Sequence, residues 1–181
     1  MIFSIWRKEI DFRVTLRIVI PNAAMQQAHI HTPVGSCLIE GDEAGVSKIW
    51  VLDEPVSPTG DIPEALADAV GQLTEYFAGT RKQFDFKINP HGTEFQKRVW
   101  DALLEIPFGT TTSYHALSVK LGDVKAIRAV ASANGKNPLW IVVPCHRVIG
   151  SDGSLTGYAG GLWRKKWLLE HETPPTQQSL F

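Results

Sequence analysis

The chain has 181 residues, of which 44% are hydrophobic and 20% charged, and its formal net charge is −1; this composition is typical of an ordinary soluble globular protein with one or two domains. No apolar run approaches the roughly 18 residues that a membrane helix needs, and two cysteines far apart in the sequence exclude a disulfide framework. We therefore expect an intracellular, reduced protein with no membrane span.

The first half of the sequence predicts short strands and one helix. Residues 1–24 fit poorly with the segments after them, because Pro21 breaks an early alternating run. We expect them to be a mobile extension, or the result of a start codon assigned upstream of Met25. Strands are predicted at 28–30, 36–40, 46–52 and 84–88, and a helix at 64–78. This half is a small α+β unit with no obvious chemistry.

The second half changes to helices that begin at capping residues. The predicted N-caps are Thr93, Ser113 and Asp123. The third of these helices, from 124 to 133, should end where Asn134 and Gly135 adopt left-handed conformations. The second and third helices meet at a tight glycine turn and form a helix-turn-helix candidate. A closing helix is predicted at 162–171, after a turn at 150–154.

The two halves also differ in charge. Residues 1–90 carry eight Lys/Arg against twelve Asp/Glu (−4), whereas residues 91–181 carry ten against seven (+3). The basic second half suits a polyanionic partner such as nucleic acid. A difference of this size is nevertheless common by chance and does not identify the partner by itself.

The third helix has two unlike faces. Its core stripe consists of branched aliphatic residues, namely Val124, Ile127 and Val130. The other side carries the small residues Ala129, Ser132 and Ala133, with Arg128 as the only long side chain. A small-residue face would let the backbone approach a narrow groove, and one arginine could enter the base stack, which suits minor-groove binding with base extrusion. Packing against another helix explains the small residues equally well.

The most reactive candidate is Cys145, inside I-V-V-P-C-H-R-V-I-G at 141–150. The apolar run predicts a buried strand that Pro144 ends, and the neighbouring His146 and Arg147 favour an activated thiol. A buried, inert cysteine is the alternative, and it is the interpretation we adopt for Cys37. On an extended strand adjacent side chains point to opposite faces, so His146 could reach Cys145 only through a bend or a water.

The sequence is similar to the O6-alkylguanine-DNA alkyltransferase family (methylated-DNA–protein-cysteine methyltransferases). The similarity covers residues 91–172. The motifs that carry it are G-T-E-F-Q-K-R-V-W-D-A-L at 92–103, I-P-F-G-T-T-T-S-Y at 106–114, R-A-V-A-S-A-N-G-K-N-P at 128–138, V-P-C-H-R-V-I-G at 143–150, G-S-L-T-G-Y-A-G-G-L at 153–162 and K-W-L-L-E-H-E at 166–172. T-P-V-G at 32–35 resembles the start of the family's more variable N-terminal domain.

The resemblance implies an α/β (α+β) fold of two domains. A small ribonuclease-H-like domain is expected at 25–90, and a winged-helix-type domain with the helix-turn-helix and the alkyl acceptor at 91–172. Residues 1–24 would then be the extension and residues 173–181 a tail.

The resemblance also implies the catalytic residues. Cys145 matches the alkyl acceptor, His146 the base that activates it through a water, and Glu172 the residue that orients this base. Asn137 matches a residue that braces the backbone around the site. Tyr114 matches a residue that contacts the target phosphate and polarises the flipped guanine.

Further positions match the DNA-binding and base-binding residues of the family. Arg128 corresponds to the arginine that replaces the flipped base, and Tyr158 to a wall of the guanine pocket. Ala129 and Ser132 lie on the helix face expected in the minor groove. Lys165 matches a lysine near the site whose role the sequence does not give.

The implied function is DNA repair by direct damage reversal. A methyl or other alkyl group would pass from O6 of guanine, and in a second candidate substrate from O4 of thymine, to Cys145 in a single turnover that inactivates the protein. The implied partner is double-stranded DNA, bound by a monomer through its minor groove in the cytoplasm, or in the nucleus of a eukaryote. No cofactor is expected, and no metal, because His29, His31 and Cys37 make a poor zinc set.

Three rival functions stay open at this point. A lesion-binding relative without a nucleophile is disfavoured by the presence of Cys145, and a helix-turn-helix transcription factor by the lack of base-reading side chains around Arg128. A Cys-His hydrolase would need an oxyanion hole and turnover. Departures from the family pattern are Phe108 in place of a frequent Tyr, Ser132 in place of a frequent Gly, and the large Trp140.

Overall fold

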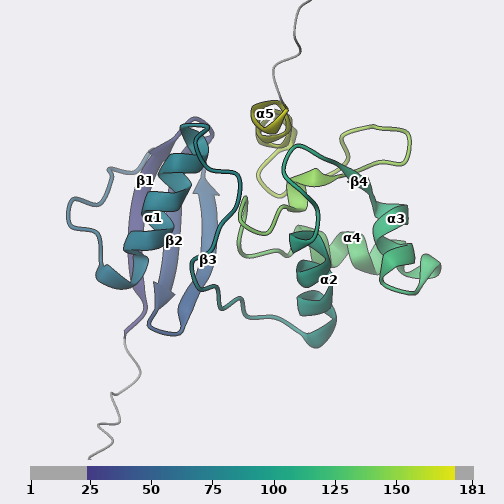
Figure 1. Cartoon of the computed structure of the whole chain (residues 1–181), viewed down its shortest axis with the longest axis horizontal. Coiled ribbons are helices and arrows are strands. Elements are labelled where there is room, and N and C mark those ends of the chain that lie inside the picture. Colours follow the sequence, from purple (N-terminus) through teal and green to yellow (C-terminus); the bar gives the residue numbers. More distant parts are fainter. Residues whose placement is uncertain (1–23, 174–181) are drawn as a thin grey trace, which may run out of the picture.

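The computed structural model describes residues 24–173, so most of the expected extension and of the tail lies outside the described residues. The described chain forms two parts that lie side by side: a sheet with one helix, and a group of shorter helices (Figure 1). Among residues 24–173, no helix combines the length and the apolar character that crossing a membrane requires.

The N-terminal part is an antiparallel meander covered by a helix. Its strands are β1 (Gln26–Thr32), β2 (Gly35–Asp42) and β3 (Gly45–Leu52), in the order β1-β2-β3, and its helix is α1 (Glu64–Phe77). Helix α1 buries Leu66, Ala69, Leu73 and Tyr76. The three predicted strands and the predicted helix are thereby confirmed, with the strands extended by one to four residues at their ends.

The predicted strand at 84–88 is wrong. This segment makes only one isolated bridge, between Ile88 and Val46 of β3, with Val46 N donating to Lys87 O at 2.9 Å and Asn89 N donating to Val46 O at 2.7 Å. The alternating phenylalanines at 84 and 86 pack partly against the core. The alternation therefore reflects side-chain burial and not a continuous backbone ladder.

The C-terminal part consists of four α-helices and one two-stranded parallel pair. The helices are α2 (Glu94–Leu104), α3 (Tyr114–Lys120), α4 (Ile127–Gly135) and α5 (Leu162–Glu172), and the strands are β4 (Thr112–Ser113) and β5 (Val148–Ile149). Capping is as predicted, because Thr93 accepts from Gln96 N in a capping box and Ser113 accepts from Ala116 N. Asp123 accepts from Lys125 N at the start of a 3₁₀ turn, Val124–Ala126, that leads into α4.

Helices α3 and α4 form the expected helix-turn-helix, but the predicted faces of α4 need correction. Val124 is 49% exposed, because it lies in the 3₁₀ turn and therefore not on the helical stripe of Val130. Ala133 is buried, and its carbonyl accepts from Trp100 Nε1 at 3.0 Å. Asn134 does not end the helix in a left-handed conformation, since α4 continues through Gly135.

The apolar run at 141–143, which Pro144 ends, is not the predicted strand. Leu139 makes one isolated bridge to Ile49 of β3, Ile141 has a positive φ of 74°, and Cys145–Arg147 form a 3₁₀ turn that leads into β5. The aliphatic side chains before Pro144 are buried all the same. A short apolar run signals burial but not the backbone conformation, and here the two diverge.

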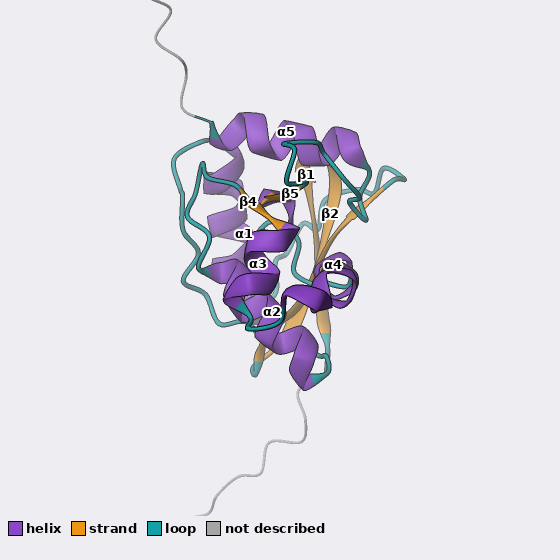
Figure 2. Ribbon diagram, turned by 90° about the vertical axis from the view of Figure 1, so that its right-hand side faces the viewer, coloured by secondary structure: helices purple, strands orange, loops and turns teal. Residues whose placement is uncertain are grey.

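Helix α5 joins the two parts, and Figure 2 shows it lying across the molecule next to α1 and the sheet. Arg164 donates from Nε to Val34 O at 2.8 Å, from Nη2 to Leu52 O at 3.2 Å and from Nη1 to Asp53 Oδ1 at 2.8 Å. The last turn of α5 contacts α1 through Glu172, whose carboxylate accepts a hydrogen bond from Tyr76.

Candidate active site

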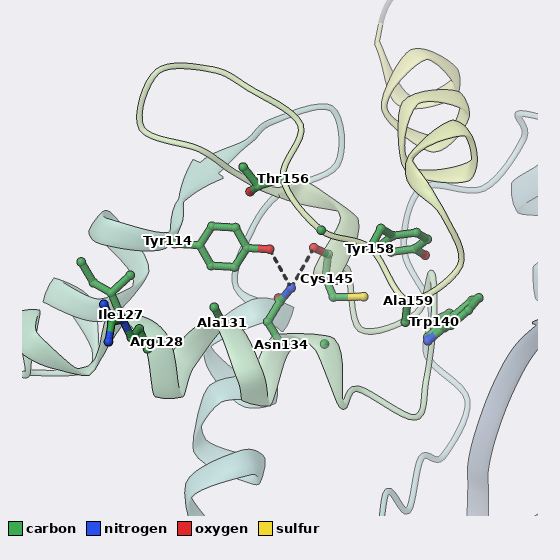
Figure 3. Close-up of a pocket in the computed structure, with 12 residues that line it drawn as sticks. Tyr114, Ile127, Arg128, Ala131, Asn134, Trp140, Cys145, Thr156, Tyr158 and Ala159 are labelled. Atoms are coloured by element: carbon green, nitrogen blue, oxygen red, sulfur yellow. Dashed lines mark hydrogen bonds between the residues drawn. The ribbon is translucent and has the colours of Figure 1, made fainter.

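Cys145 lies in the wall of a cavity of about 490 Å³ between α4 and the segment 156–159. The other lining side chains include Tyr114, Arg128, Asn134, Trp140 and Tyr158. Figure 3 shows that the aromatic rings come from both sides of the sulfur and that Arg128 lies farther out along α4. A cavity of this size and largely apolar lining is in the range of small-molecule sites.

The Cys145 thiol is nearly buried, with 3% of the residue exposed. Burial raises the pKa of the thiol to about 11, and the Asn137 side chain, the charge of Lys165 and nearby backbone amides offset this only in part. The resting thiol is therefore neutral at pH 7, which differs from the expectation that adjacent positive charge populates the thiolate. A base has to accept the proton if this sulfur is to react.

The guanidinium of Arg147 pairs with Glu172 and not with the thiol of Cys145. Its Nε donates to Glu172 Oε2 at 2.7 Å, its Nη2 to Glu172 Oε1 at 2.9 Å and its Nη1 to Ile106 O at 2.6 Å. Its place in the sequence predicts an activator of Cys145; the structure makes it the ion-pair partner of Glu172.

His146 is fully buried and hydrogen-bonded to Glu172, with Nε2 and Oε1 2.9 Å apart. Burial would raise the pKa of Glu172, but hydrogen bonds from His146 and Arg147 hold this pKa well below its usual range, so the carboxylate is charged. The proton of the neutral ring therefore lies on Nε2, and Nδ1 is left as the acceptor.

The His146 ring is also suited to accept a proton. Burial lowers its pKa despite the hydrogen bond to Glu172, so the ring is neutral at pH 7. Nδ1 of His146 is buried and has no hydrogen-bond partner among residues 24–173. Because Cys145 and His146 lie in a 3₁₀ turn, the opposite-faces geometry of a strand does not apply to them.

Two asparagines hydrogen-bond to the backbone at and before Cys145. Asn137 donates from Nδ2 to Val143 O at 2.8 Å and to Leu139 O at 3.3 Å, and its Oδ1 accepts from Leu139 N at 2.9 Å. Asn134, which the sequence did not single out for the site, donates from Nδ2 to Tyr114 Oη at 3.4 Å and to Cys145 O at 3.5 Å. The sequence did carry a signal for Asn134. It lies one helical turn after Val130, on the face of the helix that is predicted to be buried, so a buried amide could have been expected there.

Lys165 has a structural position that the sequence could not give. It is fully buried, and its Nζ donates to Val148 O at 2.6 Å and to Thr156 O at 2.8 Å. Burial lowers its pKa to about 8. The lysine therefore ties the segment that carries Thr156 and Tyr158 to the strand that follows Cys145.

Two aromatic side chains, Trp140 and Tyr158, form the far wall of the cavity. Trp140 lies between Tyr158, at 5.4 Å between ring centroids, and Trp50 of β3, at 4.0 Å. The ring of Trp140 also leaves no space for a side chain at Gly160. Trp140, which stands out in the sequence only as a large residue, is thus part of the site.

The predicted DNA-facing residues lie on the exposed side of α4. Arg128, Ala129 and Ser132 lie on its outer surface, and Arg128 is at the mouth of the cavity. Tyr114 begins α3 on the opposite wall, and burial raises the pKa of its hydroxyl, which therefore stays protonated. Of the predicted site residues, Cys145, Tyr114, Arg128 and Tyr158 line this cavity. His146, Glu172, Asn137 and Lys165 are buried behind its wall, and Ala129 and Ser132 lie on the outer surface of α4.

The three residues that we considered as a poor zinc set do not converge. Cys37 pairs with Ile30 across β1 and β2, so its side chain lies on the face opposite to those of His29 and His31. Burial raises the pKa of Cys37 to about 12. In the part of the chain that the structure describes, no group of three or more His, Cys, Asp or Glu residues is placed to hold a metal ion.

Comparison with known proteins gives the same two-part division. Residues 94–174 match the family described as the DNA binding domain of 6-O-methylguanine DNA methyltransferase, and residues 25–90 match its ribonuclease-like domain. These matches confirm the predicted fold class. The boundaries that we predicted for the extension and the tail stay predictions.

Curated relatives match this chain over almost their whole length. A methylated-DNA–protein-cysteine methyltransferase of Methanosarcina acetivorans is 47% identical over 157 residues, which is 82% of this chain and 98% of the relative. One of Mycobacterium bovis is 45% identical over 159 residues, which is 84% and 96%. The crystal structure of Mycobacterium tuberculosis OGT in complex with DNA is 44% identical, covers 81% of this chain and 92% of that one, and has a TM-score of 0.73.

Proposed function

The chain belongs to the 6-O-methylguanine DNA methyltransferase family, and from this premise we propose that it moves an alkyl group from O6 of guanine in DNA to Sγ of Cys145. It is a methylated-DNA–protein-cysteine methyltransferase, a DNA-binding transferase of DNA repair. The observation that carries the residue assignment is the position of Cys145 in the cavity wall, beside the buried His146–Glu172 pair.

The nucleophile needs His146 because its own thiol is neutral. As Sγ attacks the alkyl carbon, the thiol proton passes to Nδ1 of His146, through a bridging water. Glu172 accepts from Nε2 and stabilises the imidazolium that forms. The ring orientation required for this role is fixed by burial and by the ion pair of Glu172 with Arg147.

The bond changes balance without a cofactor. The Sγ–carbon bond forms as the carbon–O6 bond breaks, and the electron pair of that bond leaves on guanine. Tyr114, which stays protonated, donates to a ring nitrogen of the leaving guanine. The proton taken from the thiol ends on the guanine, and a thioether remains on Cys145. Because none of these groups cleaves a thioether, each protein molecule acts once.

The base reaches Cys145 only when it leaves the duplex. We propose that α4 enters the minor groove through Ala129 and Ser132, and that Arg128 takes the place of the extruded base. Tyr158 and Trp140 then form an aromatic wall for the base. One chain supplies every residue of this site, so we propose that it acts as a monomer. O4-alkylthymine is a second candidate substrate for the same cavity.

Mass spectrometry tests the proposal directly. After incubation with duplex DNA containing O6-methylguanine, the intact mass should increase by one methyl group per chain, and peptide mapping should locate it at Cys145. Cys145→Ala should abolish the gain and retain DNA binding, since affinity comes from phosphate and groove contacts. Cys37→Ala is the matched control and should still accept the methyl. A methyl on Cys37, or transfer by Cys145→Ala, would overturn the assignment.

A further inference from the structure

The carboxylate of Glu172 receives one hydrogen bond from outside the C-terminal part. Tyr76 of α1 donates its hydroxyl proton to Oε1 at 2.8 Å. The other donors, from His146, Arg147 and the backbone of Gly109, all belong to residues after 94. Among residues 24–173, Tyr76 is thus the one donor to this carboxylate that comes from the N-terminal part.

Glu172 occupies a position where a carboxylate needs such support. It is the last residue of α5, and the C-terminal end of a helix dipole disfavours a negative charge. Terminal turns of helices also fray. Tyr76 holds this turn at two adjacent residues, because its hydroxyl binds Glu172 while its carbonyl accepts from His171 Nε2 at 2.7 Å. Helix α1 therefore fixes the end of α5.

The side chain of Tyr76 is itself held in place. It is fully buried, and its ring lies 5.1 Å from that of His171, 5.5 Å from Phe84 and 6.3 Å from Phe108, between centroids. Burial and the charge of Glu172 raise the pKa of the hydroxyl far above its usual range. The hydroxyl therefore stays protonated, and acts as a donor, at neutral pH.

We infer that Tyr76 is a positioning residue for alkyl transfer, which holds the Glu172 carboxylate that orients His146. The inference rests on the function proposed above for Cys145 and His146. Tyr76 shares Oε1 with two other donors, His146 Nε2 and Arg147 Nη2, each at 2.9 Å. Loss of the hydroxyl would loosen the carboxylate of Glu172. It would also strengthen the electrostatic interaction of this carboxylate with His146.

The sign of the second effect follows from the charges around the ring. Glu172 favours protonated His146, whereas burial and the positive charges of Arg147 and Lys165 oppose it. A carboxylate with one donor fewer stabilises the imidazolium more strongly, so the pKa of His146 rises. Neutral His146 is the reactive form, and the acid side of the pH–rate profile must therefore move to higher pH.

The test compares Tyr76→Phe with the wild type and with Thr74→Val, a control that loses a hydroxyl on the same helix, where Thr74 Oγ1 donates to Val70 O. Single-turnover methyl transfer from O6-methylguanine duplex is measured from pH 5.5 to 9, with the final methyl count per chain as the measure of active protein. For Tyr76→Phe we expect a maximal rate roughly 3- to 10-fold lower and an acid midpoint about 0.3–1 pH unit higher. The DNA concentration for half-maximal rate should change less than about 2-fold.

The outcomes separate the two proposals. A wild type that gains no methyl at Cys145 refutes the proposed function itself. If the wild type reacts and Tyr76→Phe keeps the same midpoint and rate per active chain, Tyr76 only supports the fold, and the inference is wrong. If Tyr76→Phe does not fold, 3-fluorotyrosine at position 76 keeps the ring and strengthens the donor, so the midpoint must move to lower pH; an unchanged midpoint would refute the inference.

Discussion

Replacing Arg147 by Met should destabilise the protein because it leaves a buried carboxylate without its ion-pair partner. The guanidinium makes two hydrogen bonds to Glu172 and one to Ile106 O, and its side chain is only 7% exposed. Met fills much of the volume of the aliphatic stem, so the main loss is electrostatic. Removing one partner of a buried ion pair commonly costs about 3–5 kcal/mol.

The structure favours the lower end of this range for Arg147→Met. Glu172 keeps donors from His146, Tyr76 and Gly109 after the substitution. A loss of about 3 kcal/mol corresponds to a melting temperature roughly 6–12 °C lower, at about 2–4 °C per kcal/mol for a chain of this size. Differential scanning calorimetry at pH 7 measures the shift directly.

A matched control and a double variant identify the cause of the loss. Lys97→Met breaks the exposed pair with Glu94, at 3.6 Å, and should change the melting temperature by less than roughly 2 °C. Arg147→Met combined with Glu172→Gln should be more stable than Arg147→Met alone, because the uncompensated charge is gone. If the two losses simply add, or if Arg147→Met equals the control, the electrostatic reasoning fails.

Three further predictions concern DNA, acid and packing. Arg128→Ala should slow repair of duplex DNA far more than reaction with free O6-benzylguanine, because only the duplex requires base extrusion, which costs a few kcal/mol; equal losses would assign Arg128 to the fold. The folded pKa of Glu172 is depressed, so the charged carboxylate contributes fully to the free energy of unfolding above the unfolded pKa of about 4.5, and this contribution is lost progressively as the pH falls below that value. The difference in melting temperature between wild type and Glu172→Gln should therefore shrink as the pH falls from about 4.5 to about 2.5. A constant difference would contradict this. Gly160→Ala would place Cβ 2.5 Å from the ring of Trp140 and should cost about 1–3 kcal/mol, and Trp140→Leu in the same chain should recover part of that loss in a thermal melt; no loss would mean that the ring yields freely.

The sequence predicted the elements whose signals are local. The caps at Thr93, Ser113 and Asp123 and the amphipathic helix α1 were found because capping and helical periodicity depend on residues within one turn. The segment 141–143 was predicted as a strand from its β-branched residues, yet its backbone is set by distant partners. Asn137 supplies hydrogen bonds to Leu139 and Val143 that a strand neighbour would otherwise provide.

The candidate site shows the same division between local and distant information. Neighbours in the sequence suggested Arg147 as a partner of the thiol, whereas its guanidinium lies against Glu172, 25 residues farther along the chain. Tyr76 lies 96 residues before Glu172. No spacing within the sequence predicts these contacts, because they exist only when the end of α5 packs against the 3₁₀ turn of Cys145 and against α1.

Four buried ionisable residues near Cys145 are better explained by the proposed reaction than by stability. Lysine is almost never fully buried, and replacing a buried ion pair by apolar residues is often neutral or stabilising. Yet all four are buried: His146 and Arg147 belong to the 3₁₀ turn of Cys145, Glu172 binds both of them, and Lys165 binds Val148 of the strand that follows. An apolar replacement of this set would give an equally compact core, but a neutral thiol would then have no base beside it. The free-energy cost of burying these four residues is therefore confined to the place where the proposed reaction moves a proton.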